Sequence, residues 1–419
     1  MAGNVEQIET VIIGGGHAGL TMSHFLSQAG REHVVLERGR VGERWRSERW
    51  DSFCFQFPNW TIELPGYKYE CDDPDAFAPG REVVRFLDGY ADFIKAPVRS
   101  GVSVRSLERA DNSSRYLLKT NSGAIEVANV VIATGPFQFP AIPPVSAQLP
   151  GDLFQVHSSN YRNPTQLPSG AVLVVGSGSS GGQIADELIE SGRRVYFSVG
   201  RHRRVPRRYR GRDYVWWSSA MGLFDQRADS LPSVEAKNWP LPLLTGVKGG
   251  YDLDLRRMAA GGATLLGHLR SVSGNTLGIA DDLKDTLAKA DVWFTDLKKL
   301  VDDYVTRIGM DVPNESPLAE GLAEPKEISN PLLELDLKAA GITSIVWATG
   351  FRNNFDWVKL PVFDATGDPV HQRGITNLAG IYFLGLRWLY KRKSFFLIMG
   401  GPAEDALYVA EHITGKSLG

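Results

Sequence analysis

The chain of 419 residues is poor in cysteine and has no long apolar run. Its two cysteines, Cys54 and Cys71, do not form a C-x-x-C pair, which argues against thiol–disulfide chemistry and predicts free thiols in a reducing compartment. No run of 18 or more apolar residues is present, so no membrane-spanning helix is expected. The polar start, MAGNVEQIET, lacks the features of a signal peptide. We therefore expect a cytoplasmic protein without a membrane partner.

An excess of charge of one sign is also absent. The formal net charge is -2, so no overall field would attract nucleic acid. The 8 histidines are scattered without the spacing of metal ligands, and no metal site is expected. Hydrophobic residues make up 43% and charged residues 22% of the chain, which is typical of a globular protein. The length suggests two or three domains.

A glycine-rich turn between a strand and a helix lies close to the N-terminus. The strand, turn, helix and next strand are predicted at residues 9–13, 14–19, 20–29 and 33–36. In this G-x-G-x-x-G pattern, Gly14 permits a tight turn, Gly16 lets the backbone approach a pyrophosphate, and Gly19 allows close packing of helix and strand. The helix N-terminus would face the phosphates. Glu37 would accept hydrogen bonds from a ribose diol and repel a 2′-phosphate, which predicts FAD or NAD over NADP.

The same arrangement recurs near the middle of the chain. Here the strand, turn, helix and next strand are predicted at residues 171–175, 176–181, 183–190 and 195–199. Gly176, Gly178 and Gly181 repeat the spacing, but no acidic residue follows the second strand. Arg201 follows instead, and a guanidinium matches a 2′-phosphate, which predicts NADPH over NADH. At least half of the arginines in 201–212 are expected to be structural or solvated, and the isolated run does not indicate nucleic-acid binding.

Two further strands, at 130–135 and 344–350, both end in Ala-Thr-Gly. Each is expected to close one nucleotide-binding domain or to link it to the other. Residues 136–168 are rich in proline and polar residues and are predicted to form a connector. Residues 281–308 carry an apolar stripe that predicts a helix.

These elements predict an α/β fold with two Rossmann-like dinucleotide-binding domains. The first would be discontinuous, over residues 1–165 and 331–419. The second would be inserted between these parts, over residues 166–330. Within it, residues from about 207 to 330 would form a partly helical insertion.

The combined motifs resemble the flavin-containing monooxygenases, which include N- and S-oxygenases, Baeyer–Villiger monooxygenases and the plant YUCCA enzymes. The resemblance is carried by the two fingerprints in this order, the segment 42–45 (Gly-Glu-Arg-Trp), the two Ala-Thr-Gly strand ends and the connector with His157. It covers nearly the whole chain and is weakest over 207–330. The family connector pattern F-x-G-x-x-x-H-x-x-x-Y/F/W is altered here, because the leading Phe is missing and Gly151 lies further from His157.

The resemblance implies FAD in the first domain and NADPH in the second. The residues expected to bind these cofactors are Gly14, Gly16, His17, Ala18, Gly19, Glu37, Arg38, Arg44, Trp45, Thr134, Gly135, Gly176, Ser177, Gly178, Ser179, Ser180, Gly181, Arg201, Thr349 and Gly350. Gln56 and His157 are the candidate catalytic residues. Gln56 stands where N- and S-oxygenating members often carry an Asn, and a buried structural amide is its alternative role. His157 has a structural or gating role in the connector as its alternative.

The resemblance also implies a reaction. NADPH would reduce FAD, and oxygen would add at flavin C4a to give a (hydro)peroxyflavin that oxygenates a nitrogen, sulfur or carbonyl group. The expected partners are a small organic substrate and molecular oxygen, and a homodimer is one option for assembly. Alternatives are YUCCA-like oxidative decarboxylation of an α-keto acid, an NADPH-dependent flavin reductase or oxidase, and a non-catalytic nucleotide-binding regulator.

Overall fold

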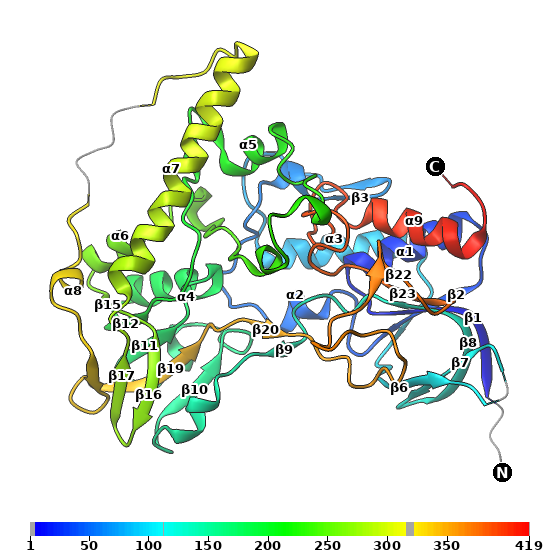
Figure 1. Cartoon of the computed structure of the whole chain (residues 1–419), viewed down its shortest axis with the longest axis horizontal. Coiled ribbons are helices and arrows are strands. Elements are labelled where there is room, and N and C mark those ends of the chain that lie inside the picture. The colour runs from blue at the N-terminus through cyan, green and yellow to red at the C-terminus, as the bar shows by residue number, and fades with distance from the viewer. Residues whose placement is uncertain (1–4, 112, 316–321, 419) are drawn as a thin grey trace.

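Two parallel β-sheets with flanking helices dominate the molecule and lie apart along its long axis (Figure 1). The structure is a computed structural model that describes residues 5–111, 113–315 and 322–418. In Figure 1 the first sheet lies on the right with the C-terminal helix α9 (Ala403–Thr414), and the second sheet lies on the left. The combination of helices and parallel sheets confirms the predicted α/β class.

The first sheet has β1 at the centre of a parallel core in the order β23-β8-β1-β2-β5. These strands are β1 (Glu6–Ile13), β2 (His33–Glu37), β5 (Val98–Ser100), β8 (Gly123–Ile132) and β23 (Ile381–Phe383). Val11, Ile12 and Ile13 of β1 are buried, as expected for a strand whose two faces are both covered. Helix α1 (His17–Gln28) connects β1 to β2 and packs against α9.

Antiparallel strands extend this sheet. β6 (Val104–Arg109) pairs with β7 (Tyr116–Thr120), which pairs with β8. At the other edge, β21 (His371–Gln372) and β22 (Ile375–Thr376) continue from β23. The segment between β2 and β5 contributes α2 (Glu43–Ser47), β3 (Glu63–Leu64), β4 (Tyr67–Lys68) and α3 (Gly80–Phe93).

The second sheet repeats the parallel pattern in the order β10-β19-β11-β12-β15. Its strands are β10 (Phe154–His157), β11 (Ala171–Val175), β12 (Val195–Ser198), β15 (Thr264–Leu266) and β19 (Ile342–Trp347). Helix α4 (Ser179–Glu190) connects β11 to β12, as α1 connects β1 to β2. A small antiparallel sheet of β16 (Leu269–Ser273), β17 (Thr276–Ile279) and β18 (Glu334–Asp336) follows β15.

The strand pairing differs from the predicted domain boundaries. β10 and β19 belong to the second sheet, although the ranges 1–165 and 331–419 had assigned both to the first domain. The two Ala-Thr-Gly strand ends are thus divided, since β8 ends in the first sheet and β19 in the second. The sequence does not reveal this pairing, because parallel pairing joins strands that are distant in sequence, and β10 is a short strand inside a proline-rich connector.

A two-stranded antiparallel ribbon links the two sheets. β9 (Phe139–Pro140) leaves the first sheet after β8, and β20 (Phe351–Arg352) leaves the second after β19. Figure 1 shows both between the sheets. Gln138 joins the two crossings, because its amide donates to Thr134 Oγ1 (3.0 Å) and accepts from the backbone N–H of Asn354 (2.9 Å).

The region 207–330 is partly helical, as its sequence predicts. It contains β13 (Arg208–Tyr209), β14 (Arg212–Asp213), α5 (Tyr214–Ala220), α6 (Leu255–Ala260), α7 (Leu283–Ile308) and α8 (Lys326–Ser329). The long helix α7 confirms the predicted helix at 281–308 and ends at Gly309 in the left-handed conformation (φ 64°). Across the described ranges, no helix combines the length and the apolar character needed to cross a bilayer.

Candidate functional site

Both glycine-rich turns use the same backbone geometry. Gly14 has φ +118° and Gly176 has φ +102°, values that favour glycine. A Cβ at Gly14 would lie 2.5 Å from the carbonyl oxygen of Ala133, and a Cβ at Gly176 would lie 2.5 Å from that of Ala348. Each turn therefore packs against the Ala-Thr-Gly end of the neighbouring strand, so the repeated tripeptide has a steric explanation.

The second and third glycines of each turn differ in their surroundings. A Cβ at Gly16 or Gly178 would meet nothing within 4 Å, so both backbones face open space. A Cβ at Gly19 would lie 1.9 Å from the carbonyl oxygen of Gly14, and a Cβ at Gly181 would lie 1.8 Å from that of Gly176. The third glycine thus allows close packing inside the protein, and the second leaves room for a bound group.

The side chains beyond the turns differ between the two units. Glu37 is buried and accepts hydrogen bonds from the N–H groups of Gly15 (2.7 Å) and Gly39 (2.8 Å). In the second unit Ser177 replaces Gly15, and its hydroxyl accepts from Gly200 N–H (2.9 Å) and donates to Gly200 C=O (2.8 Å). The first turn therefore has a fixed carboxylate, and the second is closed by a neutral hydroxyl.

One cavity of about 840 Å³ extends along both turns. The predicted residues that line it are Gly14, Gly16, His17, Ala18, Glu37, Arg38, Arg44, Trp45, Gln56, Thr134, Gly135, Gly176, Ser177, Gly178, Ser179, Ser180, Arg201, Thr349 and Gly350. Its volume is in the range of cofactor and ligand sites. Gly19, Gly181 and His157 are not among the lining residues.

The arginine run after the second unit divides into two groups. Arg201 is exposed and lines the cavity. Arg204 pairs with Asp254 (2.6 Å) and Asp291 (2.8 Å), and Arg210 pairs with Asp302 (2.6 Å). The prediction of structural roles for much of this run is confirmed for these side chains.

Arg207 is the most buried member of this run, with 1% of its surface exposed. It pairs with Asp213 (2.8 Å), and its Nη1 donates to the backbone carbonyl of Gln56 (2.8 Å). Burial lowers the pKa of this guanidinium, while Asp213 opposes the shift. Arg207 thus fixes the backbone at Gln56, which lines the cavity.

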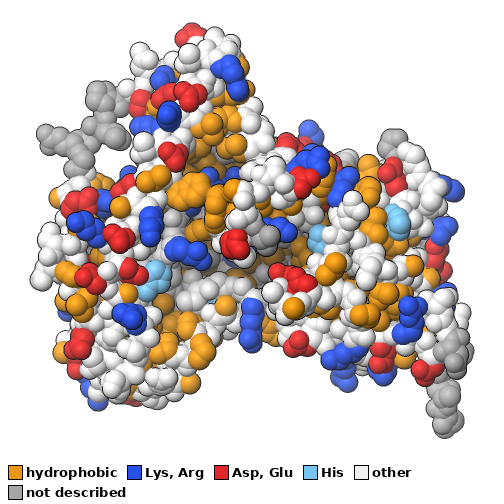
Figure 2. Space-filling view, in the orientation of Figure 1, with side chains coloured by type: hydrophobic (Ala, Val, Ile, Leu, Met, Phe, Trp, Pro, Cys, Tyr) orange, Lys and Arg blue, Asp and Glu red, His pale blue; other side chains and the backbone are white. Residues whose placement is uncertain are grey.

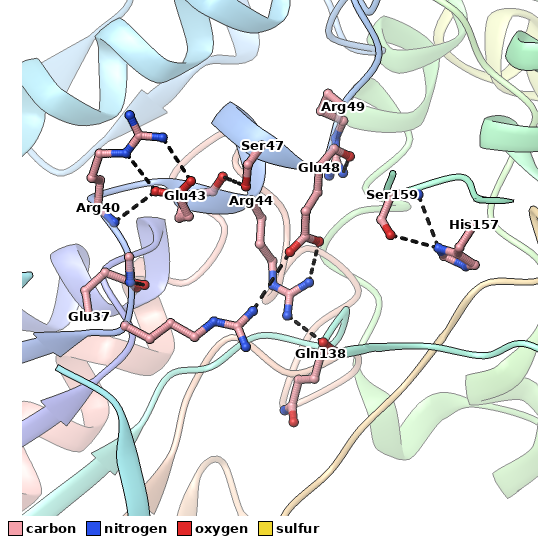
Figure 3. A network of polar contacts seen from close by, with 12 residues as sticks. Glu37, Arg40, Glu43, Arg44, Ser47, Glu48, Arg49, Gln138, His157 and Ser159 are labelled. Atoms are coloured by element: carbon pink, nitrogen blue, oxygen red, sulfur yellow. Dashed lines mark hydrogen bonds and ion pairs between the residues drawn. The ribbon is translucent and has the colours of Figure 1, made fainter. Parts of the chain in front are cut away.

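Helix α2 carries the polar wall of the cavity (Figure 3). Arg44 donates from Nη1 to Glu48 (2.6 Å) and from Nη2 to the carbonyl of Gln138 (2.7 Å), which ties α2 to the linking ribbon. Arg49 also lines the cavity, and its guanidinium lies 4.9 Å from the ring centroid of Trp45. Burial lowers the pKa of Arg49 to about 10.

His157 lies at the end of β10 and contacts the segment that leads from β19 into β20. Its Nε2 donates to the carbonyl of Gly350 (3.0 Å), and its Nδ1 lies 2.9 Å from Ser159 Oγ. Its ring meets Phe351 edge to face, with centroids 5.0 Å apart. Figure 3 shows His157 apart from the Arg44 group. These contacts place His157 at the link between the sheets, and its neighbour Ser158 lines the cavity.

The first residue of the helix after each glycine-rich turn is hydrogen-bonded to a distant loop. His17 Nε2 donates to the carbonyl of Phe395 (3.0 Å), and Ser179 Oγ donates to the carbonyl of Pro242 (2.9 Å). Burial lowers the pKa of His17 to about 4, so the imidazole is neutral near pH 7. The loop at Phe395 forms one end of the cavity, together with Phe396 and Leu397.

Sequence reasoning missed Arg49, Gln138 and Phe395 as site residues and gave Arg207 no specific role. No spacing rule distinguishes them. Gln138, Phe395 and Arg207 contact partners that are distant in the chain, and Arg49 packs over the nearby ring of Trp45. Both cysteines are free, and neither lines the cavity. Among the residues that the structure describes, no group of three or more His, Cys, Asp or Glu side chains is placed to hold a metal ion.

Comparison with known proteins agrees with this geometry. Residues 11–214 match the family model described as pyridine nucleotide-disulphide oxidoreductase. An uncharacterized CzcO-like oxidoreductase of Geobacillus kaustophilus is 31% identical over 409 residues, which cover 97% of this chain and 98% of the relative. A probable indole-3-pyruvate monooxygenase of Arabidopsis thaliana, YUCCA4, is 26% identical over 97% of this chain and 90% of its own length.

The fold is also that of a solved flavoprotein structure. A flavin-containing monooxygenase from Stenotrophomonas maltophilia superposes with a TM-score of 0.65 at 17% identity, over 98% of this chain and 99% of that one. Sequence relatives and fold agree with the resemblance drawn from the motifs. The chain belongs to the flavin-containing monooxygenase family and is a flavin-dependent oxidoreductase.

Proposed function

We propose that this enzyme is an FAD-dependent monooxygenase that takes electrons from NADPH and transfers one oxygen atom to a small organic substrate. Two Rossmann-type domains, built on the first and second sheets, would bind FAD and NADPH respectively. One observation carries the proposal. Two turns with the same open second glycine, one next to a carboxylate and one next to Arg201, line a single cavity of about 840 Å³.

The residues of the first turn fit FAD. The open backbone at Gly16 and the N-terminus of α1 would receive the pyrophosphate. Glu37 is held by two backbone amides and keeps acceptor capacity for a ribose diol. The loop at Phe395 and the α2 wall with Arg44 would flank the ring system.

The residues of the second turn fit NADPH. Gly178 and the N-terminus of α4 offer a second pyrophosphate site. Because Ser177 and Gly200 satisfy each other, no carboxylate is needed to close this turn, and a 2′-phosphate would meet no local negative charge from it. Arg201 is exposed at the cavity, where it would pair with that phosphate.

A bound flavin reduced by the nicotinamide supplies the chemistry of oxygen activation. The residues of this chain would bind and orient the cofactors and the substrate, and they would exclude water from the reacting groups. Part of the cavity wall is aromatic and consists of Phe53, Phe55, Phe57, Phe395 and Phe396. Gln56, whose backbone is fixed by Arg207, would donate its side-chain amide to an oxygen atom of the reacting group. His157 would act as a positioning residue through Gly350.

The test is NADPH consumption by the purified holoenzyme, measured together with oxygen, hydrogen peroxide and product. The substrates would be amines, sulfides, ketones and α-keto acids. We expect at least one class to suppress peroxide and to yield an oxygenated product in proportion to NADPH. Release of CO2 from an α-keto acid would identify the decarboxylating alternative. Peroxide equal to NADPH with every class would contradict a monooxygenase and favour an oxidase.

Variants of Gln56 and His157 in the same assay would distinguish a residue that contacts the reacting group from a residue that acts by position. Gln56→Leu keeps the size of a side chain that lines the cavity, and we expect it to raise the fraction of NADPH lost as peroxide. His157→Gln keeps a donor for Gly350, and His157→Ala removes it. Activity should be rescued by Gln and not by Ala if His157 acts by position. Equal loss in both variants would favour a proton-transfer role instead.

A further inference from the structure

A second cavity of about 250 Å³ lies beside the central one. It is formed between α7, the segment before Leu241 and the loop around Arg387. Pro240, Leu241 and Phe395 line both cavities, so the two are separated by shared walls. The Phe395 loop is hydrogen-bonded to His17, which follows the first glycine-rich turn. The second cavity is therefore adjacent to the proposed flavin site.

Three guanidiniums line this cavity, those of Arg203, Arg387 and Arg392. Within the described part of the chain, no ion pair joins any of these three to a carboxylate, whereas the neighbouring Arg204 pairs with Asp254 and Asp291. Arg392 is 9% exposed, and the Nε atoms of Arg203 and Arg387 are buried without a hydrogen-bond partner. Arg387 donates from Nη2 to the carbonyl of Trp239 (3.1 Å). Burying cations without counter-charges costs free energy, and an anion bound beside them would reduce that cost.

The charges in this group also act on one another. Burial, together with the positive charge of Arg392, lowers the pKa of Arg203 and of Arg387. Asp296 of α7 lines the same cavity but is exposed and forms no ion pair with the three arginines. The cavity therefore carries a surplus of positive charge. A bound anion would relieve the mutual repulsion.

The other walls are aromatic. The Arg203 guanidinium lies 4.1 Å from the ring centroid of Trp293, and Trp293 meets Trp239 edge to face at 5.3 Å. Trp388 also lines the cavity and has φ +55°, a strained left-handed conformation for a bulky residue. Aromatic walls favour a planar ligand, and the volume is below that of a drug-sized site.

We propose that this cavity, the arginine pocket, binds the carboxylate of a small planar aromatic anion, which is the substrate class of the enzyme. This inference rests on the proposed monooxygenase function, because the pocket shares walls with the flavin site. The carboxylate would lie among Arg203, Arg387 and Arg392. Its ring would lie against the tryptophans and extend toward Phe395 and the central cavity.

The test is equilibrium binding of 2-naphthoate to the holoenzyme, measured by quenching of tryptophan fluorescence before any NADPH is added. The neutral 2-naphthamide is the matched ligand. We expect naphthoate to bind at least about 10-fold more tightly than the amide, and Arg387→Gln to remove about 10-fold of that affinity. Arg203→Gln is the second variant. Arg212→Gln, an exposed arginine over Trp216 outside both cavities, is the control and should change nothing.

Thermal unfolding establishes that each variant is folded, and the KM for NADPH is measured in parallel. Equal binding of acid and amide would overturn the proposal, as would naphthoate affinity that is unchanged in both folded variants. A rise in the KM for NADPH without loss of naphthoate binding would also overturn it, because the arginines would then serve the coenzyme. Failure to retain flavin or to oxidise NADPH would contradict the proposed function instead, since the binding assay involves no turnover.

Discussion

The two glycine-rich turns share a backbone and differ in the groups that close them. In both, the first glycine packs against the alanine of an Ala-Thr-Gly strand end, and the third packs against the first. The first turn is closed by the carboxylate of Glu37, whereas the second is closed by the hydroxyl of Ser177. We infer that the backbone provides a pyrophosphate site in each unit, while the group at the end of the next strand selects the ribose.

The largest effects are expected from alanine substitutions in the turns. Gly19→Ala places a Cβ 1.9 Å from a backbone oxygen and should destabilise the protein by about 3 kcal/mol. Gly16→Ala meets no protein atom within 4 Å, so the melting temperature should be kept while flavin is lost. Gly181→Ala and Gly178→Ala are the matched pair, and Gly178→Ala should keep the flavin and lose NADPH. Loss of flavin from Gly178→Ala would contradict the assignment of flavin to the first unit and NADPH to the second.

The next effect concerns the carboxylate. Glu37→Gln keeps one oxygen but turns an amide group toward a backbone N–H that now lacks an acceptor. We expect flavin affinity to fall by about 2 kcal/mol, with the preference for NADPH over NADH unchanged. Flavin retained after gel filtration and the two KM values measure this. A changed coenzyme preference would show that the carboxylate does not act in the first unit alone.

A pH effect on folding is expected from His17 in the first unit. His17 titrates at about 4 in the folded protein, below its usual value, so protonation of the unfolded chain weakens folding as the pH falls below about 6.5. Between pH 7 and 5.5 this group should remove about 1 kcal/mol, and the loss should level off near pH 4. His17→Gln keeps a donor for Phe395 and should reduce that slope in urea unfolding, leaving the part that comes from other buried histidines such as His202. Ser179→Ala should leave the slope unchanged.

The smallest effect concerns the hydroxyl that closes the second turn. Ser177→Ala removes both hydrogen bonds to Gly200 and should cost about 1 kcal/mol of stability. The KM for NADPH should rise, and flavin content should be unchanged. The reverse exchange, Gly15→Ser, puts a Cβ 3.0 Å from the Cβ of Glu37 and should disturb flavin binding instead. Effects on the same cofactor from both changes would contradict the comparison.

Local spacing accounts for what the sequence could predict. The turns, their flanking elements and α7 follow from glycine positions and apolar periodicity within single segments. Glu37 and Arg201 follow from their distance to those turns. These features depend on neighbours in the chain, and the structure places both side chains at one cavity.

Long-range contacts account for what the sequence could not predict. β10 pairs with β19, and almost the whole second unit lies between them in the chain. The connector sequence therefore could not show to which sheet β10 belongs. Gln138 bonds Asn354, and Arg207 bonds the carbonyl of Gln56, with no pattern that links these positions. His157 matched a family pattern in sequence, but its partner Gly350 is known only from the fold.

The most direct test of the division between the units is coenzyme preference in Arg201→Ala, with flavin content measured on the same sample. Arg201 is exposed at the cavity and would pair with the 2′-phosphate alone. We predict that kcat/KM for NADPH falls by about 10-fold, that kcat/KM for NADH stays unchanged, and that flavin content is kept. The exposed Arg81→Ala outside the cavity serves as control. Equal losses for NADPH and NADH, or loss of flavin, would contradict the assignment of phosphate recognition to the second unit.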